Sequence, residues 1–242
     1  GYFPVEFGPF RTVPTGTGLA NAGHPGGREL FDTRWELLQQ MDGDLRGAAS
    51  PFGKQAAGMG ELYGNARRLM FNPAVTQAFS YTDQESARYG GTAFGNAVLT
   101  ARKVIEADQG TRFIQVTSRG WDHHGTIYAN APGRNIYNQS AEFDPAFAAL
   151  IEDLDAAGKL DETLIVACGE FGRTPGQLSS GRQGRDHYLQ MYYVFAGGGV
   201  KGGTVIGATN DTGGRGPGAF TIDPGWSKLR DVRPEDVEAT IY

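Results

Sequence analysis

The sequence predicts an α/β fold with a mostly parallel central sheet and helices on both of its faces. The apolar runs 112–117 and 164–168 are typical of buried strands. An amphipathic helix that begins near Asp144 lies between them, so a strand, a helix and a strand follow one another along the chain. That order indicates a right-handed βαβ crossover and therefore a parallel pair of strands.

The N-terminal half predicts a helical layer that covers this sheet. Residues 1–28 are rich in Gly and Pro, which predicts irregular structure. After them, the spacing of apolar residues predicts four helices, over 28–41, 55–71, 74–79 and 84–108. Thr82 and Asp83 offer capping oxygens for the last of these helices, and Gly110 follows it as a C-terminal glycine should.

The remaining elements follow from turn and capping residues in the second half. Asp144 followed by Pro145 predicts a clean helix start, with the cap and then Pro at the first position, and Gly158 predicts the helix end. The run 191–196 predicts a third strand, and 204–206 predicts a short fourth one.

We expect the whole chain, 1–242, to form a single α/β domain that is truncated at both ends. No initiating Met is present, and a helical pattern continues to the last residue. Within this domain, 1–83 is the irregular and helical covering segment, and 84–242 is the sheet core with the metal-site loops.

The composition excludes two classes of function. The formal net charge of −5 and the pI near 5.4 leave no basic face for nucleic acid. No apolar run reaches the length of a membrane span. The single cysteine, Cys168, excludes an internal disulfide and a Cys-rich zinc site, and its apolar neighbours predict a buried thiol.

Three short polar clusters hold three of the four histidines, and the first two follow predicted strands. The clusters are Gly120–His124, Gly169–Arg173 and Gly184–His187. Ligands bind beyond the carboxyl ends of the strands in open α/β sheets, so we expect these clusters to converge. For the third cluster to reach the same edge, strand 191–196 must run antiparallel to 164–168.

The side chains in these clusters are those of a metal site. Asp122 and His124 form an i, i+2 pair, which points both side chains to one side of an extended backbone. Carboxylate and imidazole together favour Zn²⁺, Mn²⁺ or Fe²⁺ over Ca²⁺ or Mg²⁺. The simpler alternative is a polar loop in which the imidazole bonds a neighbouring carbonyl. His123 points to the opposite side, which predicts a supporting or exposed position.

Two arginines beside these clusters indicate a binding site for an anionic group. A guanidinium beside a dication is the usual clamp for phosphate or sulfate, which fits Arg173 and Arg185. Either arginine could instead pair with Glu170 or Asp186. The glycines of 197–202 match a dinucleotide fingerprint only weakly, because a strand-like run rather than a helix follows them, and we reject a nicotinamide oxidoreductase on that ground.

These motifs closely resemble a bacterial family known as domain of unknown function 1501. The resemblance extends from about Leu69 to the C-terminus, and it is carried by Gly120–His124, Gly169–Pro175, Gly184–His187 and Gly197–Gly203. That family is similar to the alkaline phosphatase and sulfatase superfamily, which implies an alkaline phosphatase-like sheet and a divalent metal. From the ligand types, we expect this metal to be Zn²⁺ or Mn²⁺ rather than Ca²⁺ or Mg²⁺.

The resemblance also implies roles for individual residues. The implied metal ligands are Asp122, His124, Glu170, Asp186 and His187. From its guanidinium chemistry, Arg173 is the expected catalytic residue, which stabilises charge on the transferred group. Phe171 stands where the superfamily has a second metal-binding His, and this departure puts a full two-metal site in doubt.

The resemblance therefore predicts a metal-dependent hydrolase of phosphate or sulfate esters, including sugar-linked ones, that is periplasmic or extracellular in its full-length form. The superfamily's nucleophile would lie upstream of this chain, and no sulfatase signature occurs in it. A non-catalytic, metal-stabilised binding or structural protein outside the cytoplasm is the alternative, so enzymatic activity stays open. The oligomeric state is not predicted.

Overall fold

The structure is a computed structural model that describes residues 8–20, 22–43, 53–129, 133, 135–179, 183–209 and 221–242. The chain divides into two compact units, Gly1–Val116 and Thr117–Tyr242. The sequence-based boundary between covering segment and core lay at 83/84, inside the first of these units.

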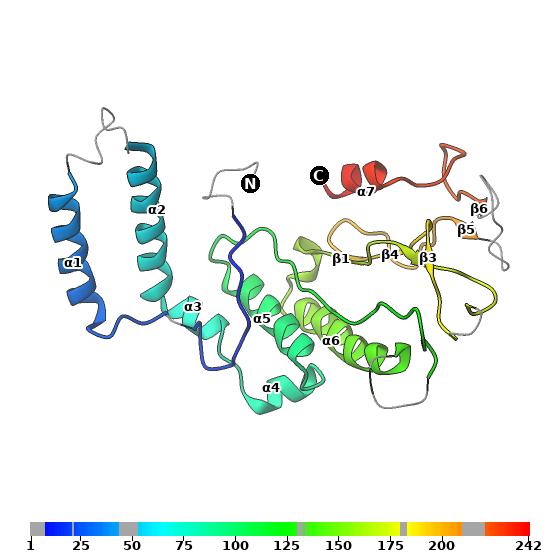
Figure 1. The fold of residues 1–242 in the computed structure, drawn as a ribbon, viewed down its shortest axis with the longest axis horizontal. Helices are drawn as coiled ribbons and strands as arrows, with labels where there is room; N and C mark the ends of the chain where they lie inside the picture. The colour runs from blue at the N-terminus through cyan, green and yellow to red at the C-terminus, as the bar shows by residue number, and fades with distance from the viewer. Residues whose placement is uncertain are drawn as a thin grey trace. The chain divides into compact units, whose positions relative to one another are not determined.

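The first unit begins with two helices, α1 (Gly27–Met41) and α2 (Gly53–Met70), that lie side by side in Figure 1. Both helices were predicted, and both are confirmed. Trp35 stacks on Tyr63 with ring centroids 4.8 Å apart. The guanidinium of Arg67 donates two hydrogen bonds to Asp32, at 2.5 and 2.8 Å. These contacts join the pair, although α1 has no buried residue.

The rest of the first unit is α3 (Pro73–Ala78), α4 (Asp83–Arg88) and α5 (Ala93–Ala107). Asn72 caps α3, whose first residue is a proline. The short helix predicted over 74–79 is confirmed. The buried apolar side chains of this unit lie mainly on α3 and α5, with Tyr89 between α4 and α5; they are Val75, Ala78, Tyr89, Val98, Leu99 and Ala101.

A single helix over 84–108 was predicted, and that prediction is wrong. The chain makes two helices there because Gly90 and Gly91 both have positive φ, at 86° and 64°. Thr92 then caps α5 by accepting a hydrogen bond from the Gly95 backbone. The Gly90-Gly91 pair is itself a turn signal, which the prediction of one helix did not use.

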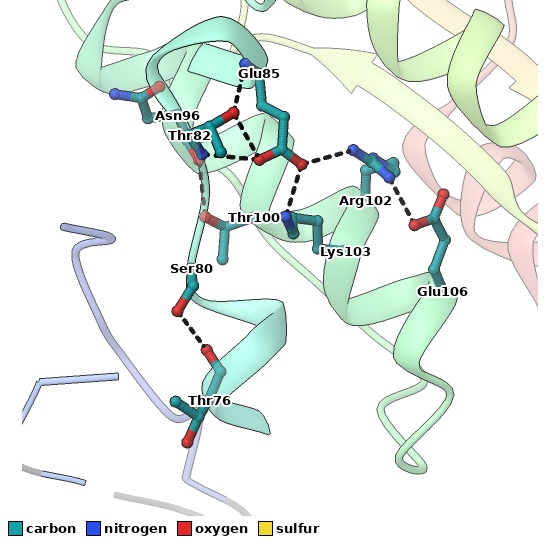
Figure 2. Close-up of polar contacts among 9 residues, drawn as sticks. All are labelled: Thr76, Ser80, Thr82, Glu85, Asn96, Thr100, Arg102, Lys103 and Glu106. Carbon is teal, nitrogen blue, oxygen red and sulfur yellow. Dashed lines mark hydrogen bonds and ion pairs between the residues drawn. The ribbon is translucent and has the colours of Figure 1, made fainter. Parts of the chain in front are cut away.

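Figure 2 shows the polar contacts that hold α4 against α5. Thr82 and Glu85 form a capping box at the start of α4. The carboxylate of Glu85 also accepts a hydrogen bond from Lys103 on α5, at 2.7 Å. Because Lys103 donates this bond, the pKa of Glu85 lies below its usual range.

The second unit is built on one long helix, α6 (Ile136–Ala156). Its start at Asn135 contradicts the predicted start at Asp144 and Pro145. The side chain of Asn135 accepts a hydrogen bond from the Asn138 backbone, so a cap exists nine residues earlier, and Pro145 lies inside the helix. After Gly158, a 3₁₀ turn over Leu160–Glu162 leads into the first strand.

The mostly parallel central sheet is contradicted by the structure. In the described residues the strands form three two-stranded antiparallel sheets, of which the largest pairs β1 (Leu164–Cys168) with β4 (Tyr193–Gly197), side by side in Figure 1. The antiparallel direction of this pair was predicted and is confirmed. The parallel partner 112–117 is not a strand, and Phe113 is 81% exposed. Without that partner no βαβ crossover forms.

Two smaller antiparallel pairs complete the second unit. β2 (Gly172–Arg173) pairs with β3 (His187–Tyr188), and β5 (Ala208–Thr209) pairs with β6 (Thr221–Asp223). The predicted strand 204–206 is absent, since these residues have no strand partner. The last helix is α7 (Pro234–Ile241). Cys168 ends β1 on the exposed side, so the predicted buried thiol is also wrong.

Among the described helices, none combines the length and the apolar character that crossing a membrane requires.

Candidate metal site

The first polar loop is anchored to α6. The buried side chain of Gln139 donates a hydrogen bond to the carbonyl of Arg119, at 2.7 Å. Trp121 packs edge-on against Phe143 of the same helix, and its indole N–H donates to Ser118. The backbone around Asp122–His124 is therefore fixed by a helix rather than by the end of a parallel strand.

The second and third loops are joined by the β2–β3 ribbon. In this ribbon Arg173 lies opposite His187, and paired residues of an antiparallel ladder point to the same face. Beyond the ribbon, the backbone N–H of Thr174 donates to the carbonyl of Asp186, at 3.0 Å. The two loops thus present their side chains as one unit.

Backbone contacts bring the third loop against the first. The N–H of Arg185 donates to the carbonyl of His123, at 3.0 Å. Gly184 is buried beside it, so close to the carbonyl of His124 that a β-carbon at 184 would overlap that carbonyl. A glycine at this position lets the two backbones approach closely.

These contacts gather three side chains into a group that could hold a cation. One ligand atom each from Asp122, His124 and His187 lies within 4.8 Å of the others. His124 Nε2 is 2.9 Å from Asp122 Oδ1 and 3.1 Å from His187 Nε2. Asp122 and His187 are exposed, so one side of the group is open to solvent.

The other two predicted ligands lie outside this group. Asp186 Oδ1 is 2.9 Å from Nδ1 of His124, the ring nitrogen on the opposite edge from the group. Glu170 is exposed and is not among the three converging side chains. The sequence-predicted set therefore separates into three residues that converge, one that contacts a converging histidine, and one that stands apart.

Arg173 lies directly beside the group. Its Nη2 donates to Asp122 Oδ1 at 2.5 Å, and its Nη1 donates to the carbonyl of Arg185 at 3.0 Å. The hydrogen bond from Arg173, and then the charges of His124, Arg173 and His187, hold the pKa of Asp122 below its usual range. Asp122 is therefore an ionised carboxylate, as a metal ligand must be.

Arg185 has a structural position instead. Its Nε donates to the hydroxyl of Tyr128, and its Nη1 donates to the carbonyls of Thr174 and Gly176. The guanidinium also lies 5.5 Å from the Tyr128 ring centroid. Neither arginine pairs with Glu170 or Asp186 in these contacts. Arg173 contacts the converging group through Asp122. Arg185 instead joins Tyr128 to the backbone of Thr174 and Gly176.

Two aromatic rings complete the surroundings. The ring of Phe171 lies 4.0 Å from that of His187, centroid to centroid. His123 is only 5% exposed, and burial, together with nearby Arg173, lowers its pKa. It is a buried neutral imidazole, whereas the sequence left a supporting or an exposed position open.

Sequence reasoning missed the residues that hold the loops in place, namely Gln139, Tyr128 and Gly184. Gln139 lies before the predicted helix start at Asp144, so nothing in the sequence indicated that it would anchor the first loop from a helix. Gly184 did carry one: a glycine directly before the Arg-Asp-His motif indicates a close backbone approach.

The donor set suits a divalent cation. Two imidazole nitrogens and one carboxylate oxygen are the ligands that Zn²⁺ and other first-row metals accept, and three protein ligands leave an open position. The three ligand atoms already lie within 4.8 Å of one another, so no rearrangement of the backbone is needed to bring them together.

Comparison with known proteins identifies a family for this chain. No curated protein and no solved structure matches the chain. A family model described as "Protein of unknown function (DUF1501)" matches residues 1–217, which include all three polar loops and the whole first unit. The chain therefore belongs to the domain of unknown function 1501 family.

Proposed function

We propose that this protein is a divalent-metal-dependent hydrolase of phosphate or sulfate esters. The observation that carries the proposal is the convergence of Asp122, His124 and His187, which lie up to 65 positions apart in the chain, beside the guanidinium of Arg173. An ionised carboxylate and two imidazoles placed in this way could all bind one divalent cation.

The proposed metal is Zn²⁺ or Mn²⁺ rather than Ca²⁺ or Mg²⁺. Imidazole nitrogen is a good ligand for the first pair, whereas the second pair prefers oxygen ligands alone. When bound, such a cation supplies Lewis-acid polarisation of an ester oxygen.

The chain's own residues bind and orient the substrate in this proposal. Arg173 has planar N–H donors that match the oxygens of a phosphate or sulfate group. It lies on the short β2–β3 ribbon opposite His187, so an anion at the open side of the group would lie within reach of its guanidinium. Its role is to stabilise negative charge on the transferred group.

The substrate class and the location belong to the same proposal. The resemblance of the motifs to the alkaline phosphatase and sulfatase superfamily supports phosphate or sulfate monoesters, including sugar-linked ones. It also supports a periplasmic or extracellular location of the full-length protein.

A non-catalytic metal-binding protein is the second candidate, and two contacts favour it. Arg173 already donates to Asp122 and to the carbonyl of Arg185, which uses one N–H of each terminal nitrogen. Phe171 packs on His187 at the position where the superfamily has a further metal-binding histidine.

Metal analysis and an activity assay on the full-length protein separate the two. Zinc and manganese content is measured first, and hydrolysis of aryl phosphate and aryl sulfate is measured next, for the wild type and for His187→Ala and Arg173→Ala. The control is His24→Ala, because His24 lies in the first unit, outside the converging group.

The hydrolase proposal expects stoichiometric metal that is lost in His187→Ala and kept in His24→Ala. It also expects turnover that falls roughly 10²–10³-fold in Arg173→Ala while the metal remains. Stoichiometric metal without turnover supports the non-catalytic candidate. A wild-type protein that binds neither metal contradicts both.

A further inference from the structure

We propose that Asp186 is a positioning residue for the metal site and not a ligand: its carboxylate fixes the ring orientation and the proton position of His124. The inference rests on the proposed function, since it assigns a role within the same site. Its starting point is that Asp186 and the converging group contact opposite edges of one imidazole.

The proton position of His124 follows from hydrogen-bond chemistry. Nδ1 lies 2.9 Å from Asp186 Oδ1, and an ionised carboxylate can only accept. Nδ1 must therefore carry a hydrogen, so Asp186 holds this edge of the ring and leaves Nε2 as the nitrogen that can bind a cation. That nitrogen faces Asp122 and His187, at 2.9 and 3.1 Å.

The surroundings of Nε2 favour a positive charge at this nitrogen. Nε2 faces the ionised carboxylate of Asp122 at 2.9 Å, so a positive charge between these two atoms is stabilising, and either a proton or a metal cation can supply it. A carboxylate that holds the far N–H of a metal-binding histidine is a recurrent arrangement, and its loss costs about 10–100-fold in metal affinity.

The backbone around Asp186 is built to hold this orientation. Its carbonyl accepts a hydrogen bond from Thr174, and the preceding Arg185 N–H donates to His123. These two backbone hydrogen bonds, one to Thr174 and one to His123, fix the position of the chain from which the Asp186 carboxylate projects. His187 follows directly in β3, so the segment that orients one histidine also supplies the other.

The test measures Zn²⁺ affinity, the absorption spectrum of bound Co²⁺ and the proton position of His124 in the metal-free full chain. The last is read from long-range ¹H–¹⁵N correlations of the imidazole rings. The variants are Asp186→Ala, Asp186→Asn and His187→Ala, and far-UV circular dichroism checks that each is folded. Asp186→Asn keeps an oxygen that can accept from Nδ1–H, so it is the conservative variant.

We expect Asp186→Ala to weaken Zn²⁺ binding about 10–100-fold, while Co²⁺ at saturation gives the wild-type spectrum because the ligand atoms are unchanged. Asp186→Asn should restore most of the affinity, and the Nδ1–H form should dominate in the wild type but not in Asp186→Ala. His187→Ala should lose binding and change the spectrum.

Two results would overturn the inference. One is wild-type affinity in Asp186→Ala, together with an unchanged proton position on His124. The other is a loss as complete as in His187→Ala, without rescue by Asn and with an altered Co²⁺ spectrum, which would make Asp186 a ligand. Absence of both Zn²⁺ and Mn²⁺ binding in the wild type overturns the proposed function itself. The nuclear magnetic resonance measurement then still shows whether Asp186 orients the ring of His124.

Discussion

Single residues decide whether the polar loops of this protein meet. Gly184 is the clearest case, because it is buried against the backbone of His124 and Gly125. Its neighbour Arg185 then donates from its backbone to His123, which places Asp186 and His187 on the converging side. The geometry of the candidate metal site thus depends on a residue that has no side chain.

Gly184→Ala should separate the two loops. The added methyl group overlaps the His124 carbonyl, so the backbones must move apart; overpacking of this kind costs about 1–3 kcal/mol. We expect lower stability in urea unfolding and weaker Zn²⁺ binding in titration calorimetry. Gly125→Ala is the matched control, since a β-carbon there meets nothing within 4 Å. Equal behaviour of the two variants would contradict the close approach.

At the scale of elements, the long helix α6 holds the first loop through Gln139 and Phe143. Both residues precede Pro145, so the anchoring depends on the helix running through the proline. A proline in a helix interior removes one backbone hydrogen bond and crowds the preceding turn. The part of α6 that carries the site is therefore formed in spite of local sequence preference.

Pro145→Ala should stabilise the protein. The substitution restores the missing backbone hydrogen bond in α6, and we expect a gain of about 1–3 kcal/mol in the free energy of unfolding. Pro234→Ala is the matched control, because Pro234 lies in the first turn of α7, where no hydrogen bond is lost. Urea unfolding measures both. A loss of stability in Pro145→Ala would instead indicate a helix that begins at the proline.

At the scale of the whole molecule, each unit contains acidic side chains held by basic partners. Arg67 lowers the pKa of Asp32, and Lys103 lowers that of Glu85. In the second unit, the hydrogen bonds from Arg230 lower the pKa of Asp236 to about 2. The folded state therefore favours the ionised form of all three groups.

The sign of the pH dependence follows from these shifts. A group whose folded pKa lies below its unfolded value stabilises the fold above the unfolded pKa, near 4, and loses that contribution as the pH falls toward the folded pKa. We expect the urea midpoint of the chain to fall steadily between pH 4 and pH 2.

Asp236→Asn should remove part of this acid sensitivity. At pH 7 the variant should be less stable than the wild type, because Arg230 loses its charged partner, and the difference should shrink by pH 2.5. Glu238→Gln, an exposed position on the same helix, is the control and should leave the pH profile unchanged. A constant difference across the pH range would mean that ionisation of Asp236 is not involved.

The sequence by itself determined the first three helices, the antiparallel direction of the strand after His187 and the residues of the polar loops. Apolar spacing is local and fixes the helices within a few positions. The strand direction follows instead from the requirement that His187 reach the other polar loops. The motifs also placed the chain in its family, which the family match supports over residues 1–217.

Only the tertiary structure decided how the loops are assembled. The sequence predicted convergence at the edge of a parallel sheet, but Asp122, His124 and His187 meet through a helix anchor, a two-residue ribbon and a glycine contact. Which ring nitrogen of His124 faces Asp186, and that Glu170 stands apart, depend on contacts between segments far apart in the chain. Such contacts have no period or spacing, so no local pattern in the sequence could reveal them.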